Sequence, residues 1–144
     1  MRGKVQVVFD CQNPDMLASF YANALGYKPQ DPPAGFSSWE DALRAWNVPE
    51  EDWDSSSAIV DPDGTGPRIY FQKMDTPKPG KNRLHLDVNA SEGLAVDLQK
   101  RKEQVAAKVE ALLKIGAKKH AEIEENGEFW VVMLDPEGNE FCVQ

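Results

Sequence analysis

Hydrophobic residues follow two different spacings along this chain, and the spacings predict strands and helices in a repeated order. Continuous or alternating apolar runs predict strands at residues 5–10, 27–30, 57–60, 68–74, 82–88, 118–124, 129–134 and 139–143. Apolar spacing and capping residues predict helices at 14–25, 39–46 and 91–115. Each half of the chain is therefore predicted to be a βαβββ module: a strand, a helix and about three further strands.

The ends of the predicted helices carry residues that favour helix termini. Asn13 is a suitable N-cap, and Pro14 suits the first helical position. Gly26 stands where a helix commonly ends in left-handed backbone. Ser38 precedes Asp41 by three residues, which is the spacing of a capping box. These residues set the expected helix boundaries.

One motif occurs in both halves at corresponding places. Residues 60–64 read Val-Asp-Pro-Asp-Gly and residues 134–138 read Leu-Asp-Pro-Glu-Gly, each between two predicted strands. Such residues favour turns, and they lack the acidic spacing of a calcium-binding loop. Two similar modules are expected to form one structure with a pseudo-two-fold axis and a ligand cavity between the copies.

The modules are predicted to form a single domain over residues 1–144. The first module spans about 1–74 and contains a helical insert at 36–55 that the second module lacks. A segment rich in Pro and Lys at 75–81 is the predicted linker. The second module then covers about 82–144.

Composition limits the classes of partner. The chain has 144 residues, 41% of them hydrophobic, and a net charge of −8. This charge argues against nucleic acid, which requires a basic surface, and slightly favours cationic small molecules. No apolar run is long enough to span a membrane, and the first residues show no signal peptide. With only two cysteines, the sequence predicts a reduced, cytoplasmic protein.

Motifs at both ends of the chain resemble those of one superfamily. They are Asn13-Pro14, Phe20-Tyr21, Leu25-Gly26 and residues 135–139 (Asp-Pro-Glu-Gly-Asn). They resemble the vicinal oxygen chelate superfamily, which includes glyoxalase I, bleomycin-resistance proteins and extradiol dioxygenases. Finer details resemble its glyoxalase-like domain branch: Asp10-Cys11, residues 83–87 (Arg-Leu-His-Leu-Asp) and residues 139–142 (Asn-Glu-Phe-Cys). The resemblance implies an α+β fold in which two tandem βαβββ modules form a curved, incomplete mixed β-barrel with the helices outside.

The same resemblance implies four positions where metal-dependent relatives carry His, Gln or Glu ligands. They are the start of the first strand and the middle of the last strand of each module. In this chain they fall on Gln6, Tyr70, Arg83 and Cys142. Only Gln6 is a usual ligand, and the guanidinium of Arg83 cannot donate to a metal. We therefore expect no metal site and no cofactor.

Strand alternation extends this set to residues on the same strand faces. The predicted cavity lining is Gln6, Asp10, Tyr70, Arg83, His85, Asp87 and Cys142. Arg83 would hold a carboxylate or enolate oxygen, and His85 would act as a general acid or base. In the alternative interpretation, His85 is a structural histidine and Arg83 forms an internal salt bridge with Asp10 or Asp87.

Other candidates also have two interpretations. Trp39, with Trp46 and Trp53 in the same insert, could cover the cavity and stack on a flat ligand, or could pack in a small core. Cys142 and Cys11 are also consistent with small buried apolar residues.

These observations leave three hypotheses of function. The first is a metal-independent enzyme of the lyase or isomerase type that uses Arg83 and His85. The second is a bleomycin-resistance-like protein that sequesters a planar or cationic compound. The third, a metal-dependent lyase or dioxygenase, is disfavoured by the residues at the four positions. In each case we expect a small-molecule ligand, no nucleic acid or membrane partner, and a homodimer in preference to a monomer.

Overall fold

The computed structural model describes residues 3–144, and these residues divide into two compact units. Unit 1 ends at Pro77, and unit 2 runs from Lys78 to Gln144. The division falls inside the segment 75–81, which the sequence marks as the linker. The start of the chain at residues 1–2, where the absence of a signal peptide was noted, lies outside the described residues.

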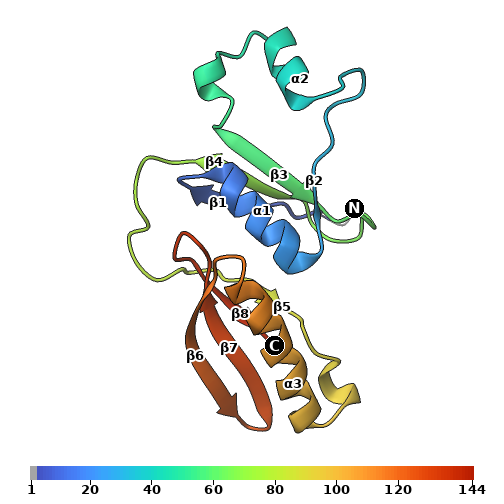
Figure 1. The fold of residues 1–144 in the computed structure, drawn as a ribbon, viewed down its shortest axis with the longest axis vertical. Helices are drawn as coiled ribbons and strands as arrows, with labels where there is room; N and C mark the ends of the chain where they lie inside the picture. The colour runs from blue at the N-terminus through green and yellow to red at the C-terminus, as the bar shows by residue number, and fades with distance from the viewer. Residues whose placement is uncertain (1–2) are drawn as a thin grey trace. The chain divides into compact units, whose positions relative to one another are not determined.

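Unit 1 contains one open sheet with helices at its face and end (Figure 1). Its elements are β1 (Val7–Cys11), α1 (Pro14–Leu25), β2 (Lys28–Pro29), α2 (Trp39–Ala45), the 3₁₀ turn η1 (Glu50–Asp52), β3 (Ser56–Val60) and β4 (Ile69–Lys73). The strand order is β1-β4-β3-β2. β1 pairs with β4 in parallel, while the other two pairs are antiparallel. The insert 36–55 forms α2 and η1, as the sequence predicts.

Unit 2 repeats this topology. Its elements are β5 (Asp87–Val88), the 3₁₀ turn η2 (Gly93–Ala95), α3 (Leu98–Leu113), β6 (Lys118–Glu125), β7 (Glu128–Leu134) and β8 (Glu140–Val143). The strand order is β5-β8-β7-β6, and β5 is parallel to β8. Two βαβββ modules with mixed four-stranded sheets confirm the predicted α+β fold class. No helix within residues 3–144 has the length and apolar character needed to cross a membrane.

Local capping chemistry positions α1. The side chain of Asn13 accepts a hydrogen bond from the backbone N–H of Met16 at 3.1 Å, which satisfies one of the free donors of the first turn. Gly26 ends the helix with a φ of 72°, in the left-handed region that glycine adopts without strain. The N-cap bond of the capping box predicted at Ser38 is also confirmed, because its hydroxyl accepts from Asp41 N–H at 3.1 Å.

The core of unit 1 lies between α1 and one face of its sheet. Leu17 and Tyr21 of α1 are fully buried, as is Phe71 of β4. The ring centroids of Phe9 and Tyr21 are 4.7 Å apart, and those of Tyr21 and Phe71 are 6.1 Å apart. Burial of each such side chain stabilises the fold by about 1.5–3 kcal/mol. Because strand residues alternate between faces, the side chains on the opposite face of this sheet do not pack against α1.

Unit 2 is built in the same way around α3. Val105, Val109 and Leu112 of the helix are buried, and so are Phe141 and Val143 of β8. Cys142 lies between Phe141 and Val143 in β8, so its side chain is on the other face of the sheet. Each sheet therefore has one face packed against its helix.

The repeated motifs form turns held by an aspartate. Asp61 accepts hydrogen bonds from Thr65 and from the backbone N–H groups of Asp63 and Gly66. Those bonds, above all the one from Gly66, lower the pKa of Asp61. Asp135 accepts in the same way from the backbone of Glu137 and Asn139. The interpretation of both motifs as turns is confirmed.

The predicted helix at 91–115 begins too early. α3 starts at Leu98, because the side chain of Asp97 accepts from Lys100 N–H at 2.8 Å and caps it there. The preceding residues form the separate turn η2, whose Gly93 has a φ of 57°. Leu94, which falls inside the predicted helix, is 85% exposed.

The predicted strand at 82–88 is also too long. Only Asp87–Val88 forms a ladder, with Cys142 and Val143 of β8 as partners. Further back, the backbone N–H of Asn82 donates to the side chain of Glu140 at 2.9 Å. The N–H of Asn82 is therefore bonded to a side chain and not to the backbone of a neighbouring strand.

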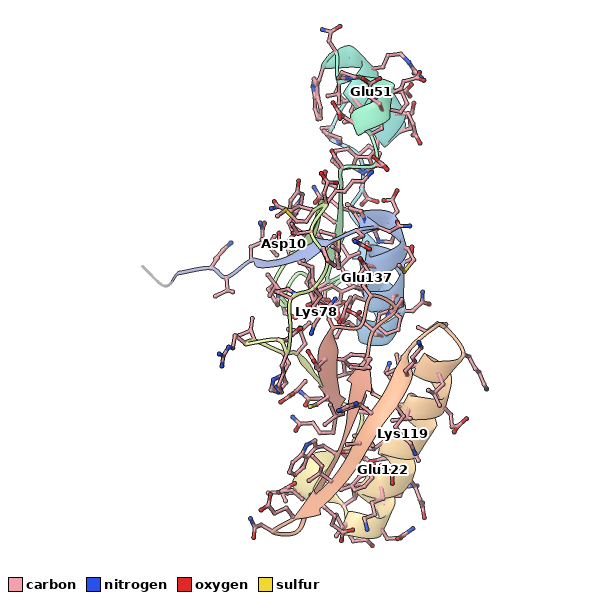
Figure 2. The ribbon with its side chains drawn as sticks, turned by 90° about the vertical axis from the view of Figure 1, so that its left-hand side faces the viewer. Asp10, Glu51, Lys78, Lys119, Glu122 and Glu137 are labelled. Carbon is pink, nitrogen blue, oxygen red and sulfur yellow. The ribbon has the colours of Figure 1, made fainter. Side chains whose placement is uncertain are left out.

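A β-bulge in β6 changes which residues share a face. The pairing with β7 shifts between Lys119 and Ala121, so that His120 is an extra, exposed residue. Lys119 and Glu122 consequently lie on the same side of the strand and form an ion pair of 2.7 Å (Figure 2).

Gly66 is a position where any side chain would clash. A Cβ atom there would lie 2.0 Å from the hydroxyl oxygen of Tyr27 and 3.1 Å from a carboxylate oxygen of Asp61. We expect Gly66→Ala to lower the free energy of unfolding by about 1–3 kcal/mol, because the ring or the turn must move. Urea denaturation measures this change. Gly80→Ala is the control, since a Cβ at Gly80 meets nothing within 4 Å; equal loss in both variants would contradict the proposed clash.

Candidate functional site

The face of the unit 1 sheet away from α1 carries three of the predicted site residues. In the parallel pairing of β1 and β4, Val8 lies opposite Tyr70 and Asp10 lies opposite Gln72. Gln6 lies just before β1 and continues the same alternation. Gln6 and Asp10 are exposed, and Tyr70 is half-buried. The structure thus places Gln6, Asp10 and Tyr70 on one face.

Arg68 is the central charged residue of this face, and it was not among the site residues predicted from the sequence. Its Nε donates to Gln30 Oε1 at 2.6 Å, and its Nη1 donates to Gln6 Oε1 at 2.9 Å. Its guanidinium carbon lies 5.1 Å from the centre of the Tyr70 ring. Three neutral groups therefore orient the guanidinium and leave its charge intact.

A hollow of about 860 Å³ lies between the insert and this face of the sheet. Its lining includes Trp39, Trp46, Trp53, Gln30, Arg68 and Tyr70. The insert stands at one end of the unit 1 sheet, where Glu51 marks it in Figure 2. The hollow is formed entirely by residues of unit 1. Trp39 and Tyr70, which were both predicted as binding residues, line it together.

The tryptophans are oriented by their own hydrogen bonds. Trp39 Nε1 donates to the backbone oxygen of Gln30 at 2.8 Å, and Trp53 Nε1 donates to that of Val48 at 2.9 Å. The guanidinium of Arg44 lies 5.3 Å from the centre of the Trp53 ring. Because their N–H groups are already satisfied, Trp39 and Trp53 can offer ring surface without an unpaired polar atom.

Unit 2 brings together three further predicted residues. Asp87 of β5 lies opposite Cys142 of β8 in the parallel ladder. His85 Nε2 lies 3.3 Å from Asp87 Oδ1, and both side chains are nearly half exposed. The donor atoms of His85, Asp87 and Cys142 all lie within 4.8 Å of one another. An imidazole beside a carboxylate is an arrangement in which the carboxylate can orient the ring for proton transfer.

The thiol of Cys142 is kept protonated by this environment. Burial raises the pKa of Cys142, and the negative charge of Asp87 and its hydrogen bond to the thiol raise it further. Lys81 acts in the opposite direction on the same pKa. Cys142 is half-buried, so the description of it as a small buried residue holds only in part. Cys11, at 5% exposed, is buried as the alternative interpretation predicted.

Arg83 is exposed and lies two residues before His85. The ion pairs formed by residues 3–144 include none from Arg83, and Asp87 is in contact with His85 instead. An internal salt bridge from Arg83 to Asp87, one of the two partners named in the structural alternative, is therefore not formed.

The four positions implied by the superfamily resemblance do not supply a fitting set of metal ligands. The amide oxygen of Gln6 already accepts from Arg68, whose positive charge would repel a divalent ion there. Tyr70 lies beneath the same guanidinium, and Arg83 has no lone pair to donate. The cluster of His85, Asp87 and Cys142 does offer three donor types that zinc accepts, a grouping that the position-by-position comparison missed. Its raised thiol pKa opposes the deprotonation that such binding requires.

Two features of the site had weak or no signals in the sequence. Arg68 follows a turn motif and reads as the polar end of a strand, so nothing marks its contact with Gln6, 62 positions away. The grouping of Cys142 with His85 depends on the parallel ladder between β5 and β8. Predicting the register of β5 against β8 would have shown that Cys142 lies beside Asp87 and His85.

Comparison with known proteins agrees with this architecture. The model of a family described as "Glyoxalase-like domain" matches residues 6–144. No curated protein matches the chain significantly.

Solved structures with the same fold are distant in sequence. A glyoxalase/bleomycin resistance protein/dioxygenase family enzyme from Burkholderia phytofirmans is 18% identical, with a TM-score of 0.61 over 96% of this chain and 94% of that one. A mutant of the fosfomycin resistance protein FosX from Listeria monocytogenes, in complex with Mn(II) and a dihydroxypropylphosphonic acid, is 11% identical, with a TM-score of 0.62 over 100% and 90%. A domain of the same description as the first, from Frankia sp., is 16% identical, with a TM-score of 0.57 over 99% and 96%. At these identities the similarity establishes the fold alone.

The environment of Cys142 makes its reactivity depend on Asp87. Only the thiolate is alkylated, so we expect iodoacetamide to modify Cys142 slowly until the pH is well above that suited to an ordinary thiol. Asp87→Asn removes a negative charge, lowers the thiol pKa and should increase the alkylation rate at pH 8 several-fold. Peptide mass spectrometry measures the rate at Cys142. Glu110→Gln removes an exposed carboxylate from α3 as the control. An unchanged rate in Asp87→Asn would contradict the assigned contact.

Proposed function

Given that this chain belongs to the glyoxalase-like domain family, whose model matches residues 6–144, we propose that it binds a small, flat organic molecule in the hollow of unit 1. The observation that carries this proposal is the set of three tryptophans of the insert lining a hollow opposite Arg68 and Tyr70. The family does not dictate the ligand, since proteins of one fold differ in the residues of their sites.

The size and lining of the hollow support this function. About 860 Å³ is within the range of pockets that enclose small organic ligands. Ligand pockets combine aromatic walls with a few oriented polar groups, and the hollow has Trp39 and Trp53 as walls and Gln30 and Arg68 as polar groups. Because the tryptophan rings are held by hydrogen bonds, little conformational entropy is lost when a flat ligand stacks on them.

Binding without chemical change would make the protein a sequestering protein. All the residues that line the hollow belong to unit 1, while the pair of His85 and Asp87 belongs to unit 2. The hollow itself has no histidine or cysteine among its lining residues. Its aromatic walls and oriented polar groups support recognition of a ligand.

A second function is favoured by one specific observation, the contact of 3.3 Å between His85 and Asp87. In this alternative His85 transfers a proton as general base, Asp87 orients the imidazole, and Arg83 holds an anionic oxygen of the substrate. The reaction would be of the lyase or isomerase type and would not require a metal.

The predicted homodimer and the cytoplasmic location also remain proposals. The small number of cysteines in the sequence, two, supports a reducing environment.

Binding in the hollow predicts a specific dependence on Trp39. Using 2-naphthamide as a neutral flat probe, we expect Trp39→Ala to weaken binding about five- to tenfold, because one stacking surface is lost. Isothermal titration calorimetry measures the affinity, and the melting temperature confirms folding. Trp130→Ala, which changes a tryptophan of unit 2, is the matched control and should bind like the parent protein. Equal affinity in all three proteins, or no binding at millimolar concentration, would refute the proposal.

The second function predicts that His85 is needed for turnover and not for binding. We expect the protein to exchange the C–H protons next to the carbonyl of 2-keto acids in D₂O, measured by NMR. His85→Gln should slow exchange at least about a hundredfold while binding stays within twofold. His120→Gln, at the other and exposed histidine, is the control. Unchanged exchange in His85→Gln would exclude this role.

A further inference from the structure

We infer that Arg68 selects the ligand of the hollow and that this ligand is a flat organic molecule with a carboxylate group. The inference rests on the proposed binding function and adds the chemical class of the ligand. It is carried by the environment of Arg68, which holds a positive charge in a fixed position and provides no negative group to neutralise it.

The guanidinium of Arg68 is held in place by neutral partners. Gln30 Oε1 accepts from Nε at 2.6 Å, and Gln6 Oε1 accepts from Nη1 at 2.9 Å. The ring of Tyr70 lies 5.1 Å from the guanidinium carbon. Amide oxygens and an aromatic face orient an arginine side chain, but they leave a full positive charge to interact with a ligand.

Part of the hydrogen-bonding capacity of Arg68 is unused. A guanidinium has five N–H groups, and the two hydrogen bonds to Gln30 and Gln6 leave both N–H groups of Nη2 and one of Nη1. The two terminal nitrogens together form the planar fork that a carboxylate accepts through both of its oxygens. Arg68 forms no ion pair within residues 3–144. A carboxylate ligand would supply the missing partner.

The carboxylates of the hollow are less effective than Arg68 at selecting a ligand charge. Asp15, Glu40, Asp52 and Asp54 line the hollow but are exposed to water, and Asp54 already pairs with Lys73 at 2.6 Å. Arg68 is half-buried, so its interaction with a ligand is less screened by water than theirs. We therefore expect the hollow to prefer an anion at Arg68, although the protein as a whole is acidic.

The arrangement also explains the shape of the expected ligand. Arg68 and the tryptophans line the same hollow, so one molecule can place a carboxylate at the guanidinium and an aromatic body against an indole ring. Trp39 is linked to the same place, since its Nε1 donates to the backbone oxygen of Gln30, whose side chain accepts from Arg68. Gln30 thus positions both the charged and the aromatic part of the site.

Three probes of nearly equal shape test the inference. They are 2-naphthoate, 2-naphthamide and 2-naphthylmethylammonium, which are an anion, a neutral molecule and a cation, and their affinities are measured by calorimetry. We expect 2-naphthoate to bind at least about tenfold more tightly than 2-naphthamide, as is usual for a charge-assisted pair. Raising the salt concentration should weaken the binding of 2-naphthoate and leave the affinity for 2-naphthamide unchanged.

Variants of Arg68 assign the preference to this residue. In Arg68→Gln, the affinity for 2-naphthoate should fall to the level of the affinity for 2-naphthamide. The affinity for 2-naphthamide should change by less than twofold. Arg68→Lys should keep part of the preference, because it retains the charge and loses the fork. Lys28→Gln removes an exposed cation of the neighbouring strand β2, outside the hollow, and should bind all probes like the parent. If a variant does not fold, the comparison of the three probes on the parent protein still tests the inference.

The outcomes separate this inference from the function on which it rests. Equal affinities for the three probes, or an unchanged preference in a folded Arg68→Gln, would overturn the role of Arg68 while binding in the hollow stands. Tighter binding of 2-naphthylmethylammonium would show that the exposed carboxylates select a cation, and would also overturn it. Failure of all three probes to bind at millimolar concentration would refute the proposed function and the inference together.

Discussion

The structure depends on one constraint, the parallel pairing of the first and last strand of each module. β1 pairs with β4, and β5 pairs with β8, so that a helix must connect the first strand to the rest of its sheet. The helix covers one face, where Phe71 and Phe141 are buried. The other face of each sheet is then available for polar residues, because strand residues alternate.

This pairing brings chemical groups together across long stretches of sequence. It sets Asp87 opposite Cys142 in unit 2, where burial and the carboxylate keep the thiol protonated. In unit 1 the same pairing ends beside Gln6 and Arg68, 62 positions apart, and their side chains form a hydrogen bond. The two modules thus use equivalent strands for different chemistry: an oriented guanidinium in the first and an imidazole, carboxylate and thiol in the second.

The insert accounts for much of the difference between the modules. Both have the same strand order, but only unit 1 has α2 and η1 between its second and third strands. This segment brings Trp39, Trp46 and Trp53 to the hollow. A repeated fold therefore provides two similar sheets, and a local insertion gives one of them a ligand-sized space. The proposed ligand binding therefore depends on the insert 36–55, which is present in only one of the two modules.

The sequence by itself determined the features that depend on neighbouring residues. These are the capping of α1 by Asn13 and Gly26, the two aspartate-held turns and the βαβββ order, because propensity and periodicity act over a few residues. Strand alternation also predicted that His85 and Asp87 share a face, while Tyr70 was a candidate through the superfamily resemblance. Only the tertiary structure decided that β5 is short, with Asn82 bound to Glu140, and that Arg68 meets Gln6 and Gln30. Those outcomes depend on competing partners brought together by folding, which local spacing does not contain.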